Sequence, residues 1–217
     1  MLKLCQTIGV LIMLSSTVSA ELTYNLFFRL EDAPDTLDVN VDLLPGQEIG
    51  ASIVLQERST DPAAHRMANG LGGVNLMIAA EGSNGAFAIT SRPTVGFALP
   101  DDSDTQIART NPFPPGLTTV SQLENGVLET VIGTVMLKAP TEMGSTTFSL
   151  VDPFPNNTTF AGVGSGTGFP KENFRLGTAT ITAVPEPGSL LALSVMGLGG
   201  IVWHRRRSAV RRTAATA

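Results

Sequence analysis

Short apolar runs, broken by glycine and proline, fill the middle of the chain from residue 21 to residue 183. Apolar and polar residues alternate at residues 38–43 and 178–182, and a period of two is typical of a half-buried strand. No long stretch shows the 3.6-residue period of an amphipathic helix. We therefore expect strands at residues 22–30, 36–43, 49–56, 73–78, 86–91, 94–99, 127–137, 146–150 and 178–183.

Many short strands separated by Gly, Pro and Asn turns favour an all-β fold, an antiparallel β-sandwich or jelly roll. One short helix is expected at residues 61–69, with Asp61 as its cap and Pro62 at its first position. Residues 100–115 and 154–170 show no clear strand, and we expect them to be loops.

The first twenty residues follow a different pattern. Lys3 precedes an apolar stretch at residues 4–14, and the small residues Val18 and Ala20 occupy the −3 and −1 positions of a cleavage site. We expect a secretory signal peptide at residues 1–20, cut between Ala20 and Glu21 by the secretion machinery. The apolar run is too short to cross a bilayer core of about 30 Å.

The number of cysteines and the distribution of charge exclude several kinds of site and partner. Cys5 is the only cysteine and lies in the signal peptide, so the mature protein has neither a disulfide nor a zinc-thiolate site. Residues 21–184 hold 8 Lys and Arg against 18 Asp and Glu, a net charge of −10. Such an acidic body, without a run of basic residues, excludes nucleic acid as a partner.

The sequence shows no catalytic constellation. His65 and His204 are the only histidines; His65 has no second ligand for a transition metal, and we expect it at the surface. The acidic segment Asp101-Asp102-Ser103-Asp104 lacks the ligand order of a calcium loop and is expected to be a solvated turn. We predict no catalytic residue, metal or cofactor. A hydrolase that uses a carboxylate pair on polysaccharide is the alternative.

The end of the chain carries the most specific pattern. It consists of the motif Val184-Pro185-Glu186-Pro187, an uncharged segment at residues 188–203 that includes Gly188, Leu190, Leu191 and Trp203, and a basic cluster at residues 204–212 that includes Arg205, Arg206 and Arg207. As a helix the uncharged segment would span about 24 Å, and we expect it to be a transmembrane helix. The positive-inside rule places the arginines in the cytoplasm and the body outside. The two prolines impose an extended segment of the kind that a protease groove binds.

In its order of motif, apolar helix and arginine cluster, the segment at residues 184–207 resembles the PEP-CTERM sorting domain. That family consists of exported proteins of biofilm- or exopolysaccharide-forming Gram-negative bacteria and their relatives. The resemblance implies recognition and cleavage by a membrane enzyme, exosortase. The same tail has also been labelled an ice-binding protein C-terminal domain, a label that describes a sorting tail and is no evidence of ice binding.

The body at residues 21–183 resembles cohesin modules in three places. Residues 44–56 are similar to their early turn and strand, residues 71–78 to the next strand, and residues 131–138 with 142–148 to their late strand–Gly–strand hairpin. The resemblance implies a β-sandwich whose sheet face binds a dockerin, and a generic β-sandwich is the alternative.

These observations predict an exported protein at the cell surface or in the extracellular matrix, with a non-enzymatic binding or structural β-sandwich. Its expected partners are an exosortase-type processing enzyme, the secretion machinery, the membrane through the C-terminal helix before processing, and a polysaccharide or another surface protein. A permanently membrane-anchored envelope protein, whose tail is never cut, is the other alternative.

Overall fold

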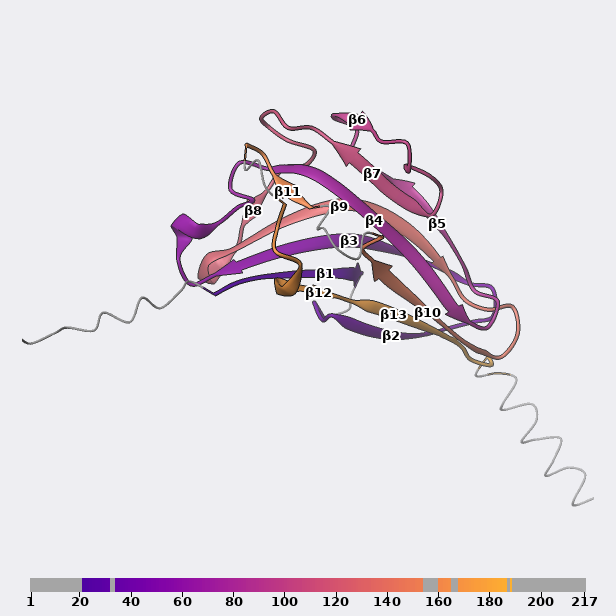
Figure 1. Ribbon diagram of the computed structural model, residues 1–217. Helices are drawn as coiled ribbons and strands as arrows, with labels where there is room; N and C mark the ends of the chain where they lie inside the picture. Colours follow the sequence, from indigo (N-terminus) through magenta and orange to yellow (C-terminus); the bar gives the residue numbers. More distant parts are fainter. Residues whose placement is uncertain (1–20, 32–33, 154–159, 165–167, 187, 189–217) are drawn as a thin grey trace, which may run out of the picture.

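The computed structural model describes residues 21–31, 34–153, 160–164, 168–186 and 188, which form two β-sheets packed face to face (Figure 1). Sheet A has the strand order β12-β1-β3-β9-β5, and β8 pairs with β9 beside this path. Its strands are β1 (Leu22–Leu30), β3 (Glu48–Ser59), β5 (Ala86–Ser91), β8 (Ser121–Gln122), β9 (Val127–Lys138) and β12 (Phe174–Leu176).

Sheet B has the strand order β2-β13-β10-β4-β7-β6, and β11 pairs with β4. Its strands are β2 (Asp38–Leu43), β4 (Leu71–Gly82), β6 (Phe97–Ala98), β7 (Gln106–Thr110), β10 (Gly144–Val151), β11 (Ala161–Gly162) and β13 (Thr178–Ala183). Three 3-10 turns complete the described elements: Pro62–Ala64, Glu124–Gly126 and Lys171–Asn173.

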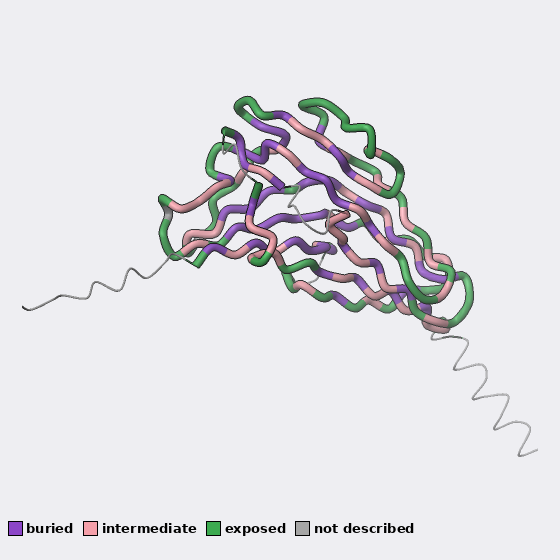
Figure 2. Tube along the Cα trace, viewed as in Figure 1, coloured by how far each residue is buried: buried purple, intermediate pink, exposed green. Residues whose placement is uncertain are grey.

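The core fills the space between the two sheets, because alternate residues of each strand point inward. Figure 2 shows buried residues recurring along the strands and exposed residues at the turns. The largest fully buried side chains come from both sheets and the turns between them: Tyr24, Phe28, Phe148, Phe160, Phe169, Leu26, Ile53, Leu55, Met67, Leu71, Leu76 and Ile107. The predicted all-β sandwich is therefore confirmed.

The sandwich is closed by two parallel pairs in an otherwise antiparallel fold. β12 runs parallel to β1 at one edge of sheet A, and β13 runs parallel to β2 at one edge of sheet B. Gly177 connects β12 to β13 and carries the chain from one sheet to the other: its N–H donates to the Leu26 carbonyl (2.8 Å), while the next N–H, of Thr178, donates to the Leu37 carbonyl (2.9 Å). The last two strands of the body thus pair with its first two.

Most predicted strands are present, and β1, β5 and β13 have the predicted bounds. The prediction that residues 100–115 lack a strand is wrong, because β7 lies within them. Ile107 is fully buried and pairs with Leu76 of β4, so β7 belongs to the core. The expected hairpin near residue 140 is also wrong: β9 and β10 lie in different sheets, and the segment between them is tied to the turn before β3 by Gly46 N–H donating to the Pro140 carbonyl (3.0 Å).

The predicted helix at residues 61–69 is only a 3-10 turn, Pro62–Ala64. Asp61 caps it as expected, since its carboxylate accepts from the Ala63 N–H at 2.9 Å. The turn cannot continue as an α-helix, because the N–H groups of Arg66 and Met67 donate to the side chain of Glu57 instead of to helix carbonyls.

The predicted signal peptide, with Ala20, lies outside the described residues. So does most of the predicted transmembrane helix and basic cluster, including Leu190, Leu191, Trp203 and Arg205–Arg207. Within the part of the chain that the structure describes, no helix is long and apolar enough to cross a membrane.

Candidate functional site: the end of strand β13 and the sheet faces

Strand β13 carries the body into the predicted motif. All six of its residues pair on both sides, antiparallel with β10 and parallel with β2. Ala179, Ile181 and Ala183 point into the core and are at most 4% exposed. The alternate residues Thr178, Thr180 and Thr182 are half-buried on the outer face of sheet B. β13 is thus an interior strand of the sheet, held by hydrogen bonds and by packing up to its last residue.

The motif begins directly on this strand. The N–H of Val184 donates to the carbonyl of Leu43 at 2.9 Å, which continues the pairing one residue beyond β13. Val184 and Pro185 are half-buried, whereas Glu186 and Gly188 are exposed. Pro187 lies outside the described residues. The chain therefore passes from buried sheet to exposed motif within three residues, without a linker between them.

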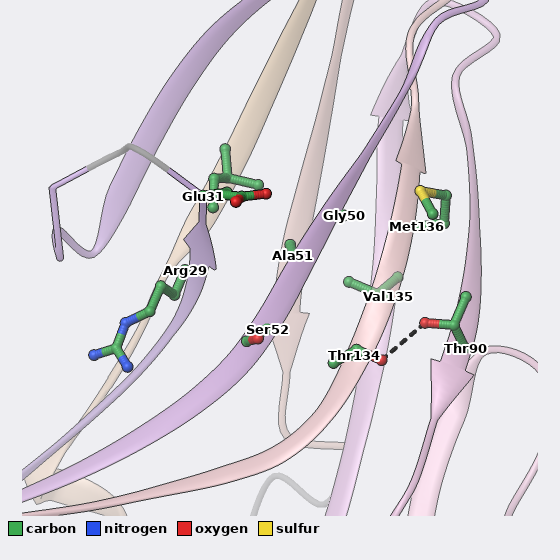
Figure 3. Close-up of a pocket in the computed structure, with 10 residues that line it drawn as sticks. Arg29, Glu31, Gly50, Ala51, Ser52, Thr90, Thr134, Val135 and Met136 are labelled. Atoms are coloured by element: carbon green, nitrogen blue, oxygen red, sulfur yellow. Dashed lines mark hydrogen bonds between the residues drawn. The ribbon is translucent and has the colours of Figure 1, made fainter.

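The outer face of sheet A is hollowed by two shallow, open grooves that share Thr90 and Met136. The larger, of about 420 Å³, crosses β1, β3, β9 and β5 (Figure 3). In this view Arg29 and Glu31 lie on the β1 side, and the hydroxyls of Thr134 and Thr90 pair at 2.9 Å on the β5 side. The grooves present small polar side chains and alkyl groups to solvent, a surface suited to contact rather than to enclosing a small molecule.

Arg29 bonds to two carboxylates and is the most strongly paired charge on this face. It makes a bidentate ion pair with Glu129 (2.7 and 2.8 Å), and its Nε donates to Asp35 (2.7 Å). Gln56 also donates to Glu129, at 2.9 Å. The Arg29 hydrogen bonds lower the pKa of Glu129, and the Gln56 bond adds to this effect against the opposing effect of burial. A general acid in glycoside hydrolysis needs a raised pKa instead, so Glu129 is unsuited to that role.

We expect the contribution of Glu129 to stability to depend on pH. Because folding lowers its pKa, the stabilisation is complete above the ordinary value of about 4.5 and is lost as pH falls through the folded pKa. Glu129→Gln should therefore lower the free energy of unfolding at pH 7, and its difference from the natural protein should shrink below pH 4.5. Urea unfolding from pH 7 to pH 3 measures this. Asp35→Asn, at the exposed carboxylate of the same arginine, should have a smaller effect. A difference that stays constant across this range would contradict the prediction.

A second charged cluster lies inside the sandwich around Glu57, which is fully buried. Its carboxylate accepts from the hydroxyl of Tyr24 (3.1 Å) and from the N–H groups of Arg66 (2.7 Å) and Met67 (2.8 Å). Burial, with the nearby Glu57 carboxylate, raises the pKa of Tyr24 far above its ordinary value. The rings of Phe169 and Phe174 stack on Tyr24 at centroid distances of 4.6 and 4.8 Å.

His65 belongs to this cluster, and the expectation that it lies at the surface is wrong. Its side chain is only 6% exposed, and its Nδ1 lies 3.4 Å from the Glu57 carboxylate. The segment that follows the 3-10 turn folds back onto Glu57, which places the imidazole inside. The cluster fixes the loop after β3 and is a structural site.

The acidic segment at residues 101–104 is held by arginines. Asp102 accepts from Arg109 at 3.1 Å and lies 3.5 Å from Arg92. Its other hydrogen bond comes from the N–H of Ala108 in β7, at 3.1 Å. Asp102 is thus a structural residue that joins the turn to β7. The expectation that it is solvated is wrong. Among the described residues, no group of three or more His, Cys, Asp or Glu side chains could hold a metal ion.

The model of the PEP-CTERM protein-sorting motif matches residues 183–207. No curated protein sequence matches the chain. Among solved structures, the ASH / PapD-like domain of human CEP192 (PapD-like domain 7) is distantly similar, with 7% identity and a TM-score of 0.28 over 86% of this chain and 99% of that domain. The predicted PEP-CTERM sorting motif is thereby confirmed. The chain carries a PEP-CTERM sorting motif that starts on the last residue of β13, and this motif implies an exported protein that an exosortase sorts to the cell surface.

Proposed function

We propose that the sorted protein acts at the cell surface or in the extracellular matrix of a biofilm as a non-enzymatic binding module, through its β-sandwich. The observation that carries this proposal is a set of exposed apolar side chains in and near β6, the strand at the free edge of sheet B. Val95, Phe97 and Leu99 are 47%, 69% and 36% exposed, and Phe113 nearby in the chain is 70% exposed. We call these four residues the edge patch.

The edge patch follows from the register of sheet B. β6 is the last strand at this edge (Figure 1), and Phe97 pairs with Thr110 of β7. The N–H of Leu99 donates to the Ala108 carbonyl (2.8 Å), so the pairing continues past β6. Residues two apart in a paired segment share a face, which aligns Phe97 with Leu99. Val95 lies just before β6, and Gly96, with φ +88°, turns the chain between Val95 and Phe97. Phe113 follows Thr110 by three residues.

Aromatic and aliphatic side chains exposed together at a sheet edge support a protein partner. Such patches, rimmed by polar residues, mark protein interaction sites, and phenylalanine is enriched at their centres. The rim is supplied here by the segment at residues 101–104 and the arginines that hold it. Of the three segments that resemble cohesin modules, the first two form a turn with β3 and a part of β4, whereas the third does not form the expected hairpin.

Replacing two members of the edge patch tests the proposal. We expect Phe97→Ser with Phe113→Ser to release the processed protein from washed cells into the medium, lowering the retained fraction at least fivefold. The matched control is Met143→Ser, since Met143 is 58% exposed but lies in the segment between β9 and β10. Quantitative immunoblotting of the cell and medium fractions measures retention. Equal retention of the double variant and the natural protein would contradict a binding role for the edge patch.

A further inference from the structure

The outer face of sheet B between β2 and β4 carries hydrogen-bonding side chains and negative charge only. β2, β13, β10 and β4 are neighbours in this sheet (Figure 1). Their sequences contain no lysine or arginine, whereas Asp38, Asp42 and Glu81 are exposed on them. The basic residues of the body all lie in other elements. We call the outward-pointing residues of these four strands the acceptor face.

The register of the four strands arranges the acceptor face in rows that cross the sheet. The middle row runs from β2 to β4 through Asn40, Thr180, Thr147 and Glu81. Because side chains alternate along a strand, the hydroxyls of β13 and β10 point outward together. They belong to Thr178, Thr180, Thr182, Ser145, Thr147 and Ser149. Neighbouring strands are about 4.8 Å apart, which is close to the length of one sugar ring in an extended glycan.

The acceptor face offers more hydrogen-bond acceptors than donors. A carboxylate only accepts, and a hydroxyl has one proton and two lone pairs. The Thr178 hydroxyl donates its proton to the Asp38 carboxylate at 2.8 Å, and the hydroxyls of Thr147 and Thr180 bond to each other at 3.0 Å. Lone pairs of these side chains remain available to a ligand. A complementary ligand therefore supplies donors, and an ammonium group supplies three of them together with a positive charge.

The side chains of the acceptor face favour a polysaccharide over a protein as the ligand. Protein interfaces centre on aromatic, methionine or arginine side chains in well-packed pockets. Of the large hydrophobic residues that are exposed in the described part of the chain, none lies on these four strands. The hydroxyl groups of a sugar both donate and accept, so they can bond the free lone pairs of the rows and the amide of Asn40. A regular row of such groups suits a polymer that repeats the same groups.

We propose that the acceptor face binds a polysaccharide whose sugars carry free amino groups. The ammonium groups of different sugars pair with Asp42 at the β2 side and Glu81 at the β4 side, in charge-assisted hydrogen bonds. The sugar hydroxyls donate to the serine and threonine oxygens between these two carboxylates. This inference rests on the binding role proposed above and adds a surface that is separate from the edge patch, which lies at the opposite edge of sheet B.

Isothermal titration calorimetry of the full chain, solubilised in a non-ionic detergent at pH 6, tests the proposal. The probe is a hexamer of β-1,4-linked glucosamine, and the fully N-acetylated hexamer is its neutral counterpart. We expect the glucosamine hexamer to bind about tenfold more tightly or better, because only it forms charge-assisted bonds. Equal affinities, or no binding of either hexamer, would overturn the proposal. A hexalysine peptide that binds as tightly as the glucosamine hexamer would also overturn it, in favour of a basic protein segment. The edge-patch result in washed cells would stand in each case.

A pair of double variants locates the binding. Asp42→Asn with Glu81→Gln removes two charges from the acceptor face at nearly constant side-chain size, and we expect affinity for the glucosamine hexamer to fall about tenfold. The matched control is Asp101→Asn with Asp104→Asn, which changes the net charge equally at exposed positions between β6 and β7. Its affinity should change less than about twofold, because salt screens distant charges. Equal weakening in both double variants would show that the net charge of the body attracts the glycan, and would overturn the proposed site.

Discussion

Replacing Glu57 with glutamine is expected to lower the free energy of unfolding by roughly 3 kcal/mol, a large part of the 5–15 kcal/mol that holds an ordinary domain together. The carboxylate accepts from two backbone N–H groups and one hydroxyl, all in the interior. Glutamine keeps one oxygen, and its NH₂ group must face one of these donors whichever way the amide is turned. At least one buried donor then loses its acceptor.

Equilibrium urea unfolding of residues 21–186, followed by circular dichroism, measures this loss. With a slope of about 2 kcal/mol per M, the midpoint should fall by about 1.5 M. Tyr24→Phe is the matched control, because it removes one hydroxyl from the same carboxylate and leaves Phe169 and Phe174 stacked; we expect a loss of about 1 kcal/mol. If Glu57→Gln and Tyr24→Phe had equal effects, the two backbone bonds would not contribute as we infer.

Glu57 also shows why part of the structure escapes sequence reasoning. The strand predicted at residues 49–56 stops one residue before Glu57, because charged side chains rarely point into a core. Alternation along β3 nevertheless places Glu57 on the same side as Ile53 and Leu55. A charged residue on the apolar side of an alternating strand could therefore have indicated a buried polar cluster. Its partners come from a loop about ten residues later, and no local pattern indicates that loop.

The other differences have a similar origin. β7 is a short strand between an acidic turn and a proline-rich loop, and it becomes part of the core because β4 pairs with it. Long strands with clear alternation, such as β1 and β13, were predictable because their pattern depends only on which face is buried. The sorting motif was predictable from its order of residue types. The attachment of the motif to sheet B was not predictable from the sequence. It depends on the hydrogen bond between the Val184 N–H and the carbonyl of Leu43, a residue about 140 positions earlier in the chain.

The chain crosses from sheet A to sheet B at Gly177, and this crossing allows β12 to pair with β1 and β13 to pair with β2. The Gly177 N–H donates to Leu26 in sheet A, its carbonyl accepts from Leu150 of sheet B at 3.2 Å, and the carbonyl of Leu37 lies against its Cα. β12 and β13 can run parallel to β1 and β2 only if the backbone passes through this narrow space. The same crossing positions β13, and with it the sorting motif.

We therefore expect Gly177→Ala to lower the free energy of unfolding by about 3 kcal/mol or more, at the upper end for overpacked sites. An added Cβ would lie 2.2 Å from the Leu37 carbonyl oxygen and 3.1 Å from that of Leu26. Both are backbone atoms, one directly before β2 and one in β1, so neither can move away as a flexible side chain would. Gly50→Ala is the matched control: an added Cβ there meets no atom within 4 Å, and stability should stay equal or rise by about 0.5 kcal/mol. Urea unfolding of both variants measures the difference.

Hydrogen exchange should show faster exchange in β12 and β13 of Gly177→Ala, since the strain separates these strands from β1 and β2 first. Equal stability of the two alanine variants would mean that the crossing can widen at little cost, and that β12 and β13 are held less tightly against β1 and β2 than their pairing suggests.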